Sequence, residues 1–118
     1  MDGSYLNLAT FKKNGTVVET PMWFVELDAK TYLFTDGTSF KVKRLRRDER
    51  ARIAPCTMNG RVTGVWQDRK GRLVEDPILQ ERVYDALKAK YGWQMRLLDL
   101  GSAIGGRIGR RAVIELRT

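Results

Sequence analysis

Residues 5–35 read YLNLATFKKNGTVVETPMWFVELDAKTYLFT, and this stretch determines the fold class. Valine, threonine and aromatic residues, which favour strands, fill three segments of it, at residues 5–11, 16–27 and 31–35. The Asn-Gly pair after Lys13 separates the first two segments and is a strong hairpin signal. The three segments predict an antiparallel meander, and Pro21 predicts an edge position or a bulge in the long second strand.

Helix and strand signals alternate through the middle of the chain. Residues 41–47 predict a short helix, and residues 51–56 and 65–74 predict two more strands. Gly71 predicts a turn or a bulge within the second of these strands.

A longer helix is predicted near the C-terminal end. Asp76 can cap it, Pro77 suits its first position, and Gly92 suits the position just after its end. Apolar side chains recur every four residues and mark one buried stripe: Leu79, Val83, Leu87 and Tyr91.

Three segments complete the expected order of elements. Residues 93–100 predict a second short helix, residues 101–109 a glycine-rich connection, and residues 111–116 a closing strand. Antiparallel strands with a late helix predict a mainly β protein, a small barrel formed by one domain over residues 1–118.

Composition excludes several kinds of chemistry. The 118 residues contain no histidine, which excludes His-based acid–base catalysis, Ser-His-Asp and Cys-His hydrolysis, and most catalytic zinc sites. Cys56 is the one cysteine, so no disulfide can form within the chain and a reducing, cytoplasmic location is expected. No apolar run approaches the roughly 18 residues that span a membrane, and residues 1–4 do not resemble a secretion signal.

Basic residues concentrate in one segment. The net charge is +8, and residues 41–52, KVKRLRRDERAR, supply +5 of it. One interpretation is a phosphate site, because a helix start offers free N–H groups and Lys41 adds a charge. The second is a solvated charged face. The third is a nucleic-acid surface, which is disfavoured because no aromatic residues are interleaved to stack on bases.

Two other features have an ordinary explanation beside a functional one. Trp23, Trp66 and Trp93 could line a planar cofactor, or they could pack in a core or an interface. The glycines of residues 101–109 match neither a Walker A motif nor a dinucleotide fingerprint and predict a linker. The carboxylates show no catalytic pairing, and no metal-ligating cluster is visible in the sequence.

The sequence also resembles a known family. Residues 5–56 follow the pattern of the pyridoxamine 5′-phosphate oxidase-like split-barrel proteins, and GRVTGVW (60–66), AKYGW (89–93) and RRAVIELR (110–117) fit the same pattern. More narrowly, the chain resembles a small actinobacterial-type branch of F-420-dependent enzymes, where F-420 is a deazaflavin coenzyme. The resemblance implies a six-stranded antiparallel split β-barrel of the FMN-binding type, and a homodimer with a cofactor at each interface site.

The resemblance also implies which residues hold the cofactor. Thr20, Pro21 and Trp23 would lie on the strand beside the ring system, and Phe34 and Thr35 would contact the ring or the phosphate.

The phosphate region of the family falls on the basic segment. Ser39 and Lys41 match the family's phosphate motif, Lys43 and Arg44 would support the phosphate or an anionic tail, and Trp66 would close the site from the other subunit.

Two departures argue against pyridoxamine phosphate oxidation. Phe40 precedes the phosphate lysine, where the FMN enzymes carry arginine, and Thr20 stands where the true oxidases have arginine. The chain also lacks their C-terminal substrate segment with its histidine.

Several functions follow as expectations. The leading one is an F-420-dependent oxidoreductase that transfers a hydride to an unknown organic acceptor. The alternatives are an FMN flavoprotein and a cofactor-binding protein without turnover. A strongly basic chain favours the more anionic deazaflavin.

Overall fold

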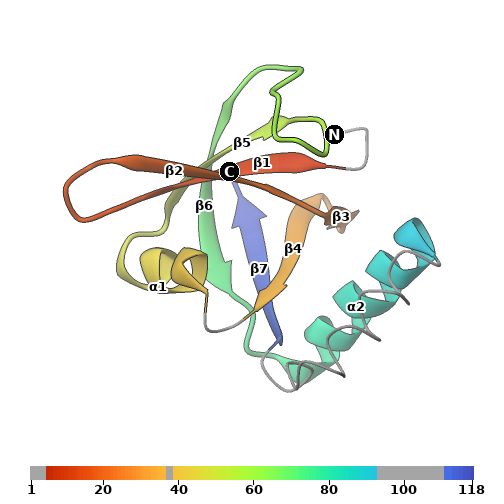
Figure 1. Ribbon diagram of the computed structural model, residues 1–118. Helices are drawn as coiled ribbons and strands as arrows, with labels where there is room; N and C mark the ends of the chain where they lie inside the picture. The colour runs from red at the N-terminus through yellow and green to blue at the C-terminus, as the bar shows by residue number, and fades with distance from the viewer. Residues whose placement is uncertain (1–4, 37–38, 93–110) are drawn as a thin grey trace.

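A computed structural model describes residues 5–36, 39–92 and 111–118 (Figure 1). The described strands are β1 (Leu6–Phe11), β2 (Val17–Met22), β3 (Phe24–Leu27), β4 (Lys30–Asp36), β5 (Arg50–Pro55), β6 (Gln67–Leu73) and β7 (Arg111–Arg117). The helices are α1 (Phe40–Arg47) and α2 (Pro77–Tyr91). The predicted helix over residues 93–100 and the predicted connection over 101–109 lie outside the described residues. None of the helices in the described ranges is long and apolar enough to cross a membrane.

The strands form one curled antiparallel sheet in the order β2-β1-β5-β6-β7-β4-β3 (Figure 1). This confirms the mainly β split-barrel prediction. The described sheet has seven strands rather than six because the long strand predicted over residues 16–27 is divided at Trp23. Before Trp23 the chain pairs with β1, and after it the chain pairs with β4 at the opposite edge of the sheet.

Pro21 lies on an edge strand, as predicted, since β2 pairs only with β1. A proline has no N–H for a second neighbour, so an edge strand tolerates it without losing a ladder hydrogen bond.

Two turns connect the strands of the predicted meander, and they differ in backbone conformation. In the first, Gly15 has a φ of +86°, and the Lys12 N–H donates to the Thr16 carbonyl at 2.9 Å. In the second, Asp28 and Ala29 have φ values of +52° and +66° and connect Leu27 directly to Lys30. A two-residue turn with positive φ at both positions matches the right-handed twist of its strands.

Apolar side chains pack on both faces of the sheet. The interior of the barrel holds one cluster: Leu6, Leu8, Met22, Phe24, Leu33, Leu45, Ala51, Ile53, Ile114 and Leu116. A second cluster lies on the outer face beneath α2: Val25, Tyr32, Val74, Val83, Leu87, Tyr91 and Val113. The alternation of side chains along β3, β4 and β7 supplies both clusters from the same strands.

Gly71 has a packing role, and the turn or bulge predicted near it is wrong. It pairs in regular register with Leu116 inside β6. A Cβ atom here would lie 3.1 Å from Leu116 Cδ2 and 3.2 Å from Leu45 Cδ2. The missing side chain therefore lets α1 approach the sheet closely.

The helix signals of α2 are confirmed. Asp76 accepts a hydrogen bond from the Ile78 N–H at 2.9 Å, and Gly92 ends the helix with a φ of +57°. Of the predicted stripe, three side chains are buried and Leu79 is partly buried against them.

Candidate functional site

A cavity of about 290 Å³ opens where the chain crosses from β2 to β3. The end of β4 and the start of α1 form its other walls. Its lining residues are Tyr5, Thr20, Pro21, Met22, Trp23, Phe34, Thr35 and Lys41. Segments far apart in the sequence meet here because the curled sheet brings both of its edges together at Trp23.

Trp23 forms a rigid aromatic wall. Its ring stacks on the Tyr91 ring with centroids 4.3 Å apart and planes 6° apart. The Tyr91 hydroxyl accepts from the Phe24 N–H and donates to the Phe24 carbonyl, both at 2.9 Å. Burial raises the pKa of Tyr91 to about 12, so the phenol stays protonated and keeps both bonds at neutral pH.

Lys90 supports the same corner from α2. Its ammonium donates to the Phe24 carbonyl at 2.9 Å and lies 3.5 Å from the centroid of the Phe24 ring. Burial lowers the pKa of Lys90, and the nearby Glu26 carboxylate opposes that shift. The backbone next to Trp23 is thus held by two side chains of α2.

The β4 wall is also aromatic. The Phe34 ring packs on the Tyr84 ring with centroids 5.7 Å apart. Thr35 follows it and pairs with Ala112 of β7.

The start of α1 supplies the cationic wall. Ser39 is the residue before the helix, and its carbonyl accepts from the Lys43 N–H at 3.3 Å. The Ser39 hydroxyl is buried and has no hydrogen-bond partner among the described residues. Lys41, the second residue of α1, lines the cavity. A helix start, a lysine and an unsatisfied hydroxyl together make a site suited to an anion.

Comparisons with known proteins identify the family and support the fold. Residues 4–118 match the sequence profile of the pyridoxamine 5′-phosphate oxidase family. The chain belongs to this family. The match covers nearly all of the sequence and confirms the family resemblance, while membership of the F-420 branch stays a prediction.

Solved structures show the same fold. The conserved hypothetical protein Rv2991 of Mycobacterium tuberculosis superposes with a TM-score of 0.72 at 22% identity, over 97% of this chain and 72% of that one. The heme storage protein HutZ of Vibrio cholerae superposes with a TM-score of 0.71 at 15% identity, over 97% of this chain and 80% of that one. A third structure is a Clostridium acetobutylicum protein related to general stress protein 26, of the pyridoxinephosphate oxidase family. It superposes with a TM-score of 0.67 at 17% identity, over 98% of this chain and 75% of that one. No protein of curated function matches the sequence.

The structure of this family member brings together most of the site residues that the sequence predicted. Six of them line the one cavity: Thr20, Pro21, Trp23, Phe34, Thr35 and Lys41. Lys43 and Arg44 instead line a separate groove. Ser39, two residues before Lys41, lines none of the described cavities. Trp66 is half-buried just before β6 and lines none of the described cavities.

Two lining residues of this family member, Met22 and Tyr5, are not among the predicted cofactor contacts. Met22 stands two positions after Thr20, so the period-2 alternation of a strand could have placed it on the same face. Tyr5 reaches the cavity because Leu6 pairs with Met22, a register that the sequence alone does not reveal.

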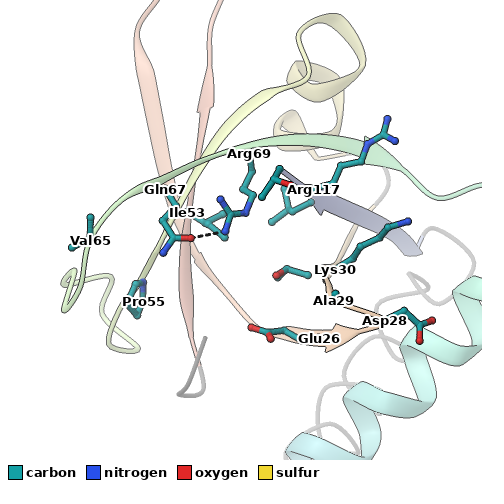
Figure 2. A pocket seen from close by; sticks show the side chains of 13 residues that line it. Glu26, Asp28, Ala29, Lys30, Ile53, Pro55, Val65, Gln67, Arg69 and Arg117 are labelled. Atoms are coloured by element: carbon teal, nitrogen blue, oxygen red, sulfur yellow. Dashed lines mark hydrogen bonds between the residues drawn. The ribbon is translucent and has the colours of Figure 1, made fainter.

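A larger cavity, of about 800 Å³, lies at the opposite end of the β3–β4 hairpin (Figure 2). Its rim carries charges of both signs: Glu26, Asp28, Lys30, Arg69 and Arg117. Arg69 donates to the side chain of Gln67 on the same strand (Figure 2). None of the predicted site residues lines this cavity, so the family pattern and the geometry indicate the smaller one.

Proposed function

We propose that the chain holds a flavin-type cofactor in the cavity beside Trp23 and acts as an oxidoreductase. One observation carries the proposal: the aromatic ring of Trp23 and the cationic Lys41, at the start of α1, line the same cavity. A flavin or deazaflavin joins a planar ring system to a phosphate, so each feature would have a partner on one ligand.

The residues present fit such a cofactor. The Ser39 hydroxyl is buried without a hydrogen-bond partner in the described part of the chain, and a phosphate oxygen would satisfy it. Lys41 would add a charge-assisted bond to the same phosphate. The ring system would lie along the strand from Thr20 to Trp23, where Trp23 is already held in place by Tyr91.

The cavity is small for a whole flavin. Ligand pockets commonly enclose about 300–1,000 Å³, and this one encloses about 290 Å³. We therefore propose that a second subunit completes each site, as the family resemblance implies.

F-420 is the proposed cofactor, and FMN is the alternative. The net charge of +8 favours the more anionic deazaflavin. Membership of the pyridoxamine 5′-phosphate oxidase family supports a flavin cofactor in general. Heme, by comparison, would find no histidine ligand in the 118 residues.

The bound cofactor would supply hydride transfer to an organic acceptor. The protein's own residues would bind the phosphate, orient the ring and exclude water from one side of it. Neither the hydride transfer nor these binding roles require a histidine or a pair of carboxylates.

Titration of the purified protein with F-420 and with FMN, followed by cofactor fluorescence, tests the proposal. We expect tight binding of F-420 and weaker binding of FMN. The reverse order would make the protein an FMN flavoprotein, and binding of neither would contradict the proposal.

Turnover separates an oxidoreductase from a carrier. Reduced cofactor is mixed with a panel of enones, quinones and tetrapyrroles, and its oxidation is followed by absorbance. Oxidation with at least one acceptor is expected. Tight binding without any oxidation would favour a cofactor-binding protein that has no activity of its own.

A further inference from the structure

The β1–β2 hairpin reaches past the sheet on the side of α1 (Figure 1). A basic groove is lined by residues of this hairpin and of α1. It measures about 610 Å³ and shares no lining residue with the cavity beside Trp23. Its lining residues are Lys12, Lys13, Phe40, Lys43, Arg44 and Arg47. Five of these six carry a positive charge, and the sixth is aromatic.

Phe40 is unusually exposed for a large apolar residue. It is the first residue of α1, directly before Lys41, and its relative exposure is 69%. The Lys43 ammonium lies 5.2 Å from the centroid of its ring, and the Arg44 guanidinium lies 5.8 Å from it. An aromatic face open to solvent and flanked by cations can stack on a planar group that carries phosphates.

The charges of the groove are not offset by acids within it. No acidic residue lines it in the described part of the chain. Asp48, next to Arg47, forms an ion pair with Arg50 at 2.8 Å. Asp68 of β6 forms an ion pair with Arg52 at 3.2 Å. Those two acids are therefore committed to arginines that do not line the groove.

The two walls of the groove are tied together. The Arg47 guanidinium donates to the Phe11 carbonyl at the end of β1. This bond joins α1 to the hairpin that carries Lys12 and Lys13. The bond therefore fixes α1 and the hairpin relative to each other on this side of the groove.

We propose that this groove binds single-stranded nucleic acid, with Phe40 stacked on an unpaired base and the five cations holding the flanking phosphates. A single strand fits better than a duplex because the ring needs a base whose face is free. The sequence disfavoured nucleic acid for lack of an interleaved aromatic. In the structure Phe40, at the edge of the basic segment, supplies that aromatic.

Fluorescence anisotropy tests the proposal with a labelled 20-nucleotide strand of mixed sequence and with its duplex. Titrations run from 50 to 200 mM salt on the full chain. We expect tighter binding of the single strand. Each cation–phosphate contact contributes about 0.7 to the slope of log affinity against log salt. Lys43→Gln/Arg44→Gln should therefore reduce the magnitude of the slope by about 1.4.

A matched control removes the same charge elsewhere. Arg82→Gln/Lys88→Gln changes two exposed cations of α2 and should keep both the slope and the affinity close to those of the parent. An equal loss in both double variants would overturn the proposal, because net charge alone would then explain binding.

The stacking step has its own variants. Phe40→Ala should weaken single-strand binding about tenfold, whereas Phe40→Trp should preserve it. Ile78→Ala, at an equally exposed apolar residue of α2, should have no effect. Unchanged affinity in Phe40→Ala, or no binding at 50 mM salt, would overturn the proposal.

Discussion

Ala29 illustrates how a single residue can hold a strained backbone. Its φ of +66° lies in the left-handed region, where a Cβ atom crowds the following carbonyl. Asp28 before it tolerates this region better because its short polar side chain can bond locally. The backbone of the β3–β4 turn is therefore strained at Ala29, and the pairing of β3 with β4 compensates for this strain.

Replacing Ala29 by glycine should stabilise the protein. Asp-Gly is a preferred pair for this turn, and relief of the strain should raise the free energy of unfolding by up to about 1 kcal/mol, since added freedom in the unfolded chain offsets part of the gain. Urea unfolding of Ala29→Gly and the parent measures the difference. A clear loss of stability would contradict the assignment of strain to this residue.

Lys41 is the residue on which the proposed phosphate site depends most. Lys41→Ala should weaken cofactor binding by about tenfold or more, since a bond to a charged group contributes about 1.5–3 kcal/mol. The salt dependence of binding should fall with it. Cofactor fluorescence titrations at low and physiological salt measure both quantities.

Lys88→Ala is the matched control, because Lys88 is an exposed lysine on α2 that does not line the cavity. It should bind like the parent. Parental affinity in Lys41→Ala would remove Lys41 from the site.

At the scale of elements, α2 acts as a brace for the bend between β2 and β3. Val83 and Leu87 pack on the outer face of the sheet, and Tyr91 reaches the backbone of Phe24. The end of this helix thereby fixes Trp23, the wall of the candidate site. The cavity keeps its shape through an element that contributes no lining residue.

Tyr91→Phe should destabilise this brace. The buried Phe24 N–H would lose its acceptor, at a cost of about 1–3 kcal/mol. Urea unfolding at pH 7 measures the cost. An unchanged free energy of unfolding would show that the hydroxyl does not hold the bend.

The same residue predicts a dependence on alkaline pH. The pKa of Tyr91 is about 12 in the folded chain, against an ordinary value of 10.0. As the pH rises, the unfolded chain releases this proton before the folded chain does. The stability that the protonated Tyr91 contributes to the folded chain is therefore complete below pH 10 and is lost as the pH rises toward 12. The parent should lose up to about 1.4 kcal/mol per pH unit more than Tyr91→Phe in this window. Equal slopes would contradict the assignment.

At the scale of the whole molecule, the two edges of the sheet are joined directly by the polypeptide chain. β2 and β3 occupy the two edges, yet a single residue separates them in the chain. The curl leaves the candidate site open to solvent at this junction, with exposed Pro21 on its rim. A partner subunit would add stability to a protein of this size and would complete the open pocket.

We expect a homodimer. Light scattering should give about twice the 13.6 kDa mass of one chain, with one cofactor bound per chain. Cofactor affinity should fall when the protein is diluted below its dimerisation constant. A monomer that binds cofactor at full affinity would contradict a site shared between subunits.

The local elements, and the kinds of chemistry that the protein lacks, could be predicted from the order of residues alone. The Asn-Gly turn, the Asp76 cap and the four-residue stripe of α2 act through neighbours in the chain, so their outcomes were predictable. The absence of histidine excluded whole classes of catalyst. The family resemblance predicted most of the residues that meet at the cavity.

The way in which distant segments combine could be seen only in the folded chain. The tertiary structure divided residues 16–27 at Trp23, gave Gly71 a packing role in a regular strand, and added Tyr5 and Met22 to the cavity. It also separated Lys43 from the cavity and placed it in a groove beside the exposed ring of Phe40. The physical reason is that these outcomes depend on strand register and on the curl of the sheet, which are set by contacts between residues far apart in the sequence.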